Sequence, residues 1–156
     1  MPTKTYYFDT NALWKYYLGQ LEYGYVALQQ FMVEQNQPVL VSDMTLLEFV
    51  GRLTKGYRKK EIQKNHLRKI LQKVRHDIEE THLFEITHIP TEAYNKAQEL
   101  LINNPESKFG SNDALHLAVV YNLHQINSGF TMVTFDEPMQ RICQRIGLDF
   151  YDPETP

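Results

Sequence analysis

Two kinds of hydrophobic pattern follow each other along this chain. Short runs rich in β-branched and aromatic residues predict strands at 5–8, 39–41, 84–86 and 130–134, with a short edge strand at 148–150. Between these runs, apolar residues recur every three or four positions, which predicts helices. Strands that are separated by helices favour a parallel sheet with helices on both of its faces. The expected fold class is therefore α/β.

One predicted helix, beginning at Ser111, is apolar on every side. Its apolar positions are Ala114, Leu115, Leu117, Ala118, Val119 and Val120. Such a helix is expected at the centre of the protein, packed by neighbours all around. Asp113 lies in its first turn, where a carboxylate meets free N–H groups and the positive end of the helix dipole. A helix cap is thus the simplest role for Asp113, and a functional role is the alternative.

Length and composition describe an ordinary globular protein. The 156 residues predict a single domain over 1–156. No apolar run approaches the roughly 20 residues of a membrane-spanning helix, and the N-terminus lacks the layout of a signal peptide. The lone Cys143 lies among apolar helical neighbours and is expected to be a buried thiol. We therefore expect a cytoplasmic protein with no membrane partner.

Four acidic residues follow predicted strands or open predicted helices. Asp9 ends the first strand, Glu48 lies in the helix after the second, Asp113 heads the central helix, and Asp136 follows the strand at 130–134. The carboxyl ends of parallel strands meet at one edge of a sheet, so these side chains are expected to converge there. Simpler roles exist for each: the three aspartates as helix caps, and Glu48 as a surface partner of Arg52.

Converging carboxylates repel one another unless a proton or a cation neutralises them. All-oxygen ligands favour Mg²⁺ or Mn²⁺ over zinc, and the sequence has no cysteine cluster or HExxH motif. The six histidines are scattered, so each is expected at the surface or in the core. A carboxylate cage around Mg²⁺ or Mn²⁺ suits hydrolysis of a phosphodiester, because the metal activates water and neutralises charge on the phosphate.

Positive charge is concentrated in residues 52–76. This segment holds ten Lys or Arg and one Glu, a net charge of +9, so the rest of the chain carries −12 of the total of −3. Such asymmetry favours contact with a polyanion, although a lysine-rich solvated helix would have the same composition. The residues expected nearest the acidic edge, and therefore expected to bind a nucleic-acid substrate, are Lys55, Arg58, Lys59 and Lys60.

Four short motifs give the acids a recognisable context. They are FDTNAL at 8–13, SDMTLLE at 42–48, NDALHLA at 112–118 and VTFD at 133–136. In this order and spacing the chain resembles the PIN-domain nucleases, and among them the small VapC-type toxins of toxin–antitoxin pairs. The resemblance extends from about residue 5 to residue 150. Each motif alone is weak, and the ordered set is specific.

The resemblance implies a three-layer α/β/α sandwich with a parallel sheet of about five strands. It also implies a Mg²⁺- or Mn²⁺-dependent endoribonuclease whose metal-binding and catalytic acids map onto Asp9, Glu48, Asp113 and Asp136. Asn11, Thr45 and Thr134 match supporting polar positions that orient carboxylates or water. The implied partners are an RNA substrate, a small antitoxin protein and a second copy of the chain in a homodimer.

Other functions stay open at the level of sequence. Phe135 stands where family members often carry a basic or polar residue, which weakens the assignment of Asp136 as a ligand. A PIN domain can also process RNA outside a toxin system, or bind RNA or protein without catalysis. A phosphatase of the haloacid dehalogenase type also places an aspartate after its first strand. It requires a second aspartate two positions later, where this chain has Asn11.

Overall fold

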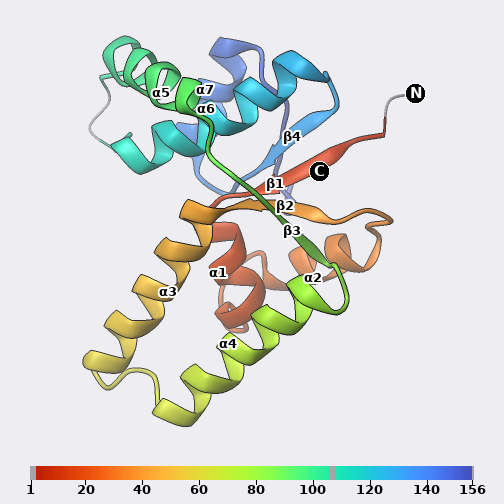
Figure 1. Cartoon of the computed structure of the whole chain (residues 1–156), viewed down its shortest axis with the longest axis vertical. Coiled ribbons are helices and arrows are strands. Elements are labelled where there is room, and N and C mark those ends of the chain that lie inside the picture. Colours follow the sequence, from red (N-terminus) through yellow and green to blue (C-terminus); the bar gives the residue numbers. More distant parts are fainter. Residues whose placement is uncertain (1–2, 106–107, 156) are drawn as a thin grey trace.

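A computed structural model describes residues 3–105 and 108–155 of the chain. Its centre is an all-parallel sheet in the order β3-β2-β1-β4-β5 (Figure 1). The strands are β1 (Thr5–Phe8), β2 (Val39–Ser42), β3 (Phe84–Thr87), β4 (Phe130–Val133) and β5 (Phe150–Tyr151). The helices are α1 (Thr10–Leu18), α2 (Tyr25–Val33), α3 (Asp43–Arg58), α4 (Lys64–Glu79), α5 (Thr91–Asn103), α6 (Ser111–Ile126) and α7 (Glu137–Ile146). The predicted α/β fold with a five-stranded parallel sheet is confirmed.

Alternating side chains send the strands' apolar residues into two separate cores. Tyr7 pairs in register with Leu40 and Met132, and these three face the core formed with α5, α6 and α7. Phe8 pairs with Val133, and both face the second core, formed with α1 to α4. Figure 1 shows these two helical layers on opposite sides of the sheet. The result is the three-layer sandwich that the sequence predicted.

The α6 helix lies at the centre of its layer. Ala114, Leu117, Ala118, Val119 and Val120 are buried, and the helix packs extensively against α5. This burial explains why the sequence of α6 has no polar face. The helix therefore holds its first turn, with Asp113, at a fixed place beside the sheet.

Element boundaries differ from the sequence pattern mainly at the last strand. The predicted strand at 148–150 is shifted to Phe150–Tyr151, where it pairs with Met132 and Val133. Gly147 ends α7 in the left-handed conformation with φ of 68°, which glycine adopts without strain. Leu148 is then buried in the core instead of extending the strand. Cys143 is buried on α7, as expected.

The order in which the chain adds strands to the sheet reverses at the central strand, β1. From β1 the sheet continues through β2 to β3 on one side and through β4 to β5 on the other. In open parallel sheets, sites form at such a point, beyond the carboxyl ends of the strands. Asp9 directly follows β1 at this edge. Among the described residues, no helix combines the length and apolar character needed to cross a membrane.

Candidate functional site

Three of the four predicted acids line one pocket at the carboxyl edge of the sheet. Asp9, Glu48 and Asp113 share a pocket of about 250 Å³. Its other lining residues are Thr10, Asn11, Arg52 and His116. The acids come from the start of α1, the middle of α3 and the first turn of α6, so the fold brings together carboxylates that are distant in sequence.

Asp9 is both a helix cap and a pocket residue. Its Oδ1 accepts a hydrogen bond from the Ala12 N–H at 2.8 Å, and its side chain is 4% exposed. Burial raises the pKa of Asp9 above its ordinary value, while positive charge on His116 and the hydrogen bonds from Ala12 and Thr134 oppose the rise. The cap fixes the carboxylate in place, so the structural and functional roles of Asp9 are compatible.

Asp113 combines the same two features on α6. Its Oδ2 accepts a hydrogen bond from the Gly110 N–H at 3.2 Å, which makes it part of the helix cap. The side chain is half-buried and also lines the acidic pocket. Asp113 therefore contributes to the helix cap, and its carboxylate also forms part of the pocket wall.

Glu48 is held by hydrogen bonds on both of its oxygens. Oε1 accepts from Thr10 Oγ1 at 2.9 Å and lies 2.8 Å from His116 Nε2, while Oε2 accepts from Asn112 Nδ2 at 2.9 Å. Burial alone raises the pKa of Glu48, but the hydrogen bonds and the charge of His116 outweigh it, so the pKa is lowered. Arg52, the surface partner that the sequence offered, instead donates to Asn11 Oδ1 at 3.1 Å.

Asp136 lies beside this pocket and not in its wall. It lines a neighbouring pocket with Asn11 and Trp14, and its N–H donates to Thr134 Oγ1 at 3.1 Å. Burial raises the pKa of Asp136, and the negative charge of Asp113 raises it further. Asp136 is therefore electrostatically coupled to the acidic pocket from one side.

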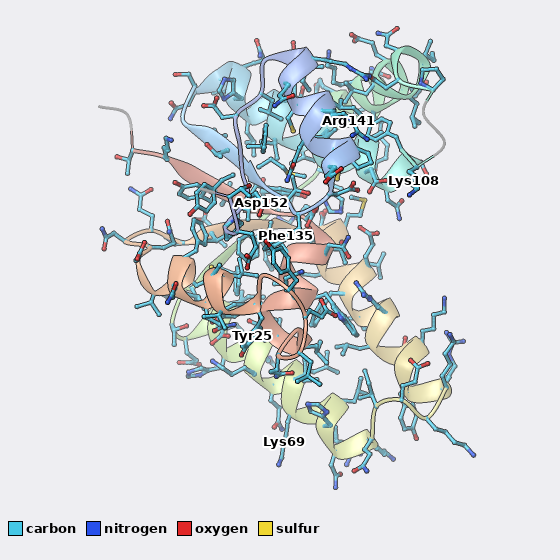
Figure 2. All side chains as sticks on the ribbon, turned by 180° about the vertical axis from the view of Figure 1, so that it is seen from behind. Tyr25, Lys69, Lys108, Phe135, Arg141 and Asp152 are labelled. Carbon is cyan, nitrogen blue, oxygen red and sulfur yellow. The ribbon has the colours of Figure 1, made fainter. Side chains whose placement is uncertain are left out.

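Two cations moderate the charge at this side of the site. Lys108 and Arg141 both lower the pKa of Asp136 by their positive charge. Figure 2 shows them in the part of the molecule formed by α6 and α7, with Lys69 of α4 at the opposite end. Lys69, which belongs to the basic segment at 52–76, thus lies far from these two cations.

The structure places the predicted supporting residues unequally. Thr134 hydrogen-bonds to Asp9 and accepts from Asp136, so it contacts two acids. Asn11 is bound to Arg52 at the pocket mouth. Thr45 is buried in the capping box of α3, with Ser42 and the hydroxyl of Tyr7 as its partners. Thr45 therefore supports the helix start and not a carboxylate directly.

His116 is the residue that the sequence interpretation missed. It is 2% exposed, and its ring lies between Glu48 and Tyr7. The available signal was its spacing, because a residue three positions after Asp113 lies on the same face of the helix. Thr10 and Asn112, which also bind Glu48, adjoin predicted acids in the sequence and were not singled out either.

The four predicted RNA-binding residues divide into two pairs. Lys55 and Lys59 line a groove of about 480 Å³ next to the acidic pocket, and Arg52 lines both. Arg52 also stacks on the ring of Trp14, with its guanidinium carbon 4.1 Å from the ring centre. Arg58, the last residue of α3, and Lys60, which adopts a positive φ of 62° just after it, do not line this groove.

The acids share an edge without forming a closed cage. Within residues 3–105 and 108–155, no three His, Cys, Asp or Glu side chains are close enough together to hold a metal ion as they stand. Glu48 in particular is directed toward its protein partners. A metal at this edge would therefore need the carboxylates to close in around it.

The sequence around these acids matches that of a known family. A family model described as the PIN domain matches residues 6–144. The chain belongs to the PIN domain family. No curated protein sequence matches it.

Solved structures share the fold of this PIN domain at low sequence identity. VapC20 of Mycobacterium tuberculosis, described as a toxin that cleaves the sarcin–ricin loop, has a TM-score of 0.63 and 13% identity, covering 88% of this chain and 94% of its own. The DNA-bound VapBC of Salmonella typhimurium has a TM-score of 0.63 and 16% identity, covering 97% and 99%. VapBC2 of Rickettsia felis, bound to a promoter DNA fragment, has a TM-score of 0.62 and 18% identity, covering 95% and 98%.

Proposed function

We propose that this PIN domain is a Mg²⁺- or Mn²⁺-dependent endoribonuclease, and that it is the toxin of a toxin–antitoxin pair. The observation that carries the proposal is the pocket shared by Asp9, Glu48 and Asp113 at the carboxyl edge of the sheet. Family membership supports nuclease chemistry at this edge. The basic residues on α3 beside the pocket support a polyanionic substrate.

The donor chemistry of the pocket fits a hard divalent cation. Its acidic ligands are carboxylate oxygens, and the buried Asp9 stands beside two further negative charges. Asp9, Glu48 and Asp113 would hold the ion, with Asp136 completing the set from the neighbouring pocket. The ion would supply an activated water and neutralise charge on the scissile phosphate.

The chain's own residues prepare the site for this chemistry. The helix cap keeps Asp9 in the pocket wall, and three hydrogen bonds keep Glu48 there, so both carboxylates would need to move only from the pocket wall toward the ion. Arg52 lies at the mouth of the pocket, where its guanidinium can meet a phosphate flanking the cleaved bond. Lys55 and Lys59 extend positive charge along α3, which favours the RNA backbone without selecting its sequence.

The structural neighbours support the biological context of the proposal. One is described as a toxin that cleaves the sarcin–ricin loop, two others are VapBC structures bound to DNA, and a further one is described as a toxin–antitoxin complex. By analogy we propose a small antitoxin protein as a partner, a homodimer as the working assembly and the cytoplasm as the location. The toxin proposal has a direct test: expression of the chain should arrest growth, and co-expression of a short gene adjacent to its own should relieve the arrest.

The nuclease proposal is tested with Asp113→Asn, which separates a ligand from a cap. The side-chain oxygen of asparagine can still accept from the Gly110 N–H, but asparagine lacks the charge that a metal ligand provides. Cleavage of structured RNA with Mg²⁺ or Mn²⁺ should fall by roughly 10²–10³ in the variant, the typical cost of removing a major electrostatic stabiliser. EDTA should abolish cleavage by the wild type.

Asp43→Asn is the matched control. Asp43 also lies in the first turn of a helix, but it is exposed and contacts His88 instead of the pocket. Its substitution should leave cleavage unchanged. Cleavage that survives both EDTA and Asp113→Asn contradicts the proposal and favours a different chemistry at this edge.

Three alternative functions are less well supported than a toxin ribonuclease, or are distinguished from it by experiment. Membership of the PIN family over residues 6–144 speaks against a phosphatase of the haloacid dehalogenase type. A PIN module without catalysis leaves the shared acidic pocket unexplained. An RNA-processing PIN nuclease would use the same acids, and the growth assay with the adjacent gene distinguishes it from a toxin.

A further inference from the structure

The most unusual polar group outside the acids is the buried imidazole of His116. Both of its ring nitrogens are engaged. Nδ1 lies 2.7 Å from the hydroxyl of Tyr7, and Nε2 lies 2.8 Å from Glu48 Oε1 and 3.2 Å from Thr10 Oγ1. His116 therefore links the central strand, through Tyr7, to the pocket acid on α3.

We propose that His116 is a positioning residue, which holds the carboxylate of Glu48 at the candidate metal site through its Nε2–H. The inference rests on the proposed function, because it assigns His116 a role through Glu48. It goes further by naming a residue other than the four acids on which metal affinity depends.

The direction of the hydrogen bond follows from the chemistry of the two groups. An ionised carboxylate can only accept, so the proton between His116 and Glu48 belongs to Nε2. Nδ1 lies on the other side of the ring, against the Tyr7 hydroxyl. The Nε2–H is therefore the group of the ring that holds Glu48.

The anchor behind His116 is rigid. Tyr7 is fully buried on β1, and its hydroxyl also lies 3.0 Å from Ser42 Oγ and 3.3 Å from Thr45 Oγ1. Ser42 and Thr45 form the capping box of α3, the helix that carries Glu48. One network thus fixes the start of α3, the ring of His116 and the end of the Glu48 side chain.

This arrangement addresses the flexibility of glutamate. Asp9 and Asp113 have short side chains at helix starts, whereas Glu48 has one more rotatable bond and is only half-buried. Among its three partners, His116 is buried, Thr10 is half-buried and Asn112 is exposed. Outer partners of this kind orient metal ligands, and their loss typically costs roughly 10–100-fold in metal affinity or activity.

Two substitutions separate this role from a purely structural one. In His116→Gln, the side-chain amide can occupy the place of Nε2 and still donate to Glu48, but it loses Tyr7. In His116→Asn, the shorter amide can occupy the place of Nδ1 and keep Tyr7, but it loses Glu48. If His116 acts only through its contact with Tyr7, asparagine should preserve the properties of the wild type better. If His116 positions Glu48, glutamine should preserve them better.

The readout is the dissociation constant of Mn²⁺ without RNA, measured by calorimetry, with thermal unfolding in EDTA recorded for every variant. His116→Asn should weaken Mn²⁺ binding by roughly 10–100-fold, and His116→Gln should keep most of the wild-type affinity. In a Glu48→Gln background, His116→Asn should cause no further loss, because the interaction that it breaks is already gone.

Other results overturn the inference. One is that His116→Gln and His116→Asn bind Mn²⁺ with equal affinity. The other is that His116→Asn weakens Mn²⁺ binding as much in the Glu48→Gln background as in the wild type. If His116→Asn does not fold, His116→Ala replaces it: this variant removes both ring nitrogens and should weaken Mn²⁺ binding when Glu48 is present but not in Glu48→Gln. A wild type that neither binds Mn²⁺ nor cleaves RNA overturns the proposed function itself, whereas a wild type that binds Mn²⁺ no better than His116→Asn overturns this inference alone.

Discussion

The hydroxyl of Tyr17 on α1 donates a hydrogen bond of 2.8 Å to the carboxylate of Asp77 on α4. Asp77 is 1% exposed, and Lys73 Nζ binds its other oxygen at 2.7 Å. Tyr17→Phe should lower the free energy of unfolding by about 1.5–3 kcal/mol, the usual contribution of a hydrogen bond to a charged group. Urea unfolding followed by circular dichroism measures the change, and RNA cleavage should persist.

Tyr16→Phe is the control for this prediction. It removes a hydroxyl from the same helix without breaking the bond to Asp77, so its effect on stability should be smaller. Equal effects of the two substitutions would show that the bond between Tyr17 and Asp77 contributes nothing specific.

Asp9 should limit stability when no metal is bound. Burial raises its pKa above the ordinary 3.8, so the ionised form costs the folded state free energy. Asp9→Asn removes the charge and keeps a capping oxygen. At neutral pH in EDTA the variant should melt higher, by roughly 2–4 °C for each 1 kcal/mol of relieved penalty.

The pH dependence of this gain has a defined sign. The penalty is present above the raised pKa of the folded state, and it disappears as the pH falls toward 3.8. The two melting temperatures should therefore converge in acid. Added Mn²⁺ should raise the melting temperature of the wild type more than that of Asp9→Asn, and identical responses would place the metal elsewhere.

The different positions of Asp113 and Asp136 predict different losses of activity. Asp113 lines the acidic pocket, whereas Asp136 lines the pocket beside it. Asp136→Asn should reduce the cleavage rate by about tenfold, as expected for a group that acts at one remove, and Asp113→Asn should reduce it far more. Single-turnover cleavage of one RNA by both variants measures the ratio, and equal losses would make Asp136 a full member of the site.

The division of the basic residues on α3 gives a matched pair of double variants. Lys55→Gln with Lys59→Gln removes two positive charges from the lining of the groove, and Arg58→Gln with Lys60→Gln removes two that do not line it. The measurement uses an Asp113→Asn background, so that the RNA is bound without being cleaved. Only the first pair should reduce the slope of log Kd against log salt concentration, by roughly 1.4 for two lost contacts to a single strand. Equal slopes for both pairs would indicate a diffuse attraction instead of a bound strand.

The thiol of Cys143 should be unreactive in the folded protein. Burial raises its pKa to about 12, so almost none is present as the reactive thiolate at neutral pH. A thiol reagent should modify it only at the rate of unfolding, and denaturant should accelerate the reaction. Rapid modification of the native protein would mean that α7 opens readily.

The elements that depend on local pattern were predictable from the sequence. The uninterrupted apolar positions of α6 predicted its burial, and the alternation of strands and helices predicted the parallel sheet. The position of Asp9 was predictable as well, because residues just after the strands of a parallel sheet gather at its carboxyl edge. The position of Asp113 was predictable because it lies in the first turn of α6, the helix that leads back into β4 and so starts at that same edge.

Contacts that depend on side-chain direction were not predictable. Thr45 precedes Glu48 by three residues and shares its helix face, yet its place in the capping box turns it toward Ser42. His116 contacts Glu48 at a separation of 68 residues and Tyr7 at 109. Such pairings are set by the packing of helices across the sheet, which residue spacing alone does not specify.

The order of the strands also governs when the site can exist during synthesis. Central strand β1 pairs with β4, so this side of the sheet cannot form until residues 130–133 have been synthesised. The acidic pocket needs Asp113 and His116 from α6 as well. At about 5–20 residues per second, the first acid emerges from the ribosome well before its partners. A nascent chain therefore cannot carry a complete pocket while its first hundred residues are being made, and the ribosome that builds it is not exposed to it during that time.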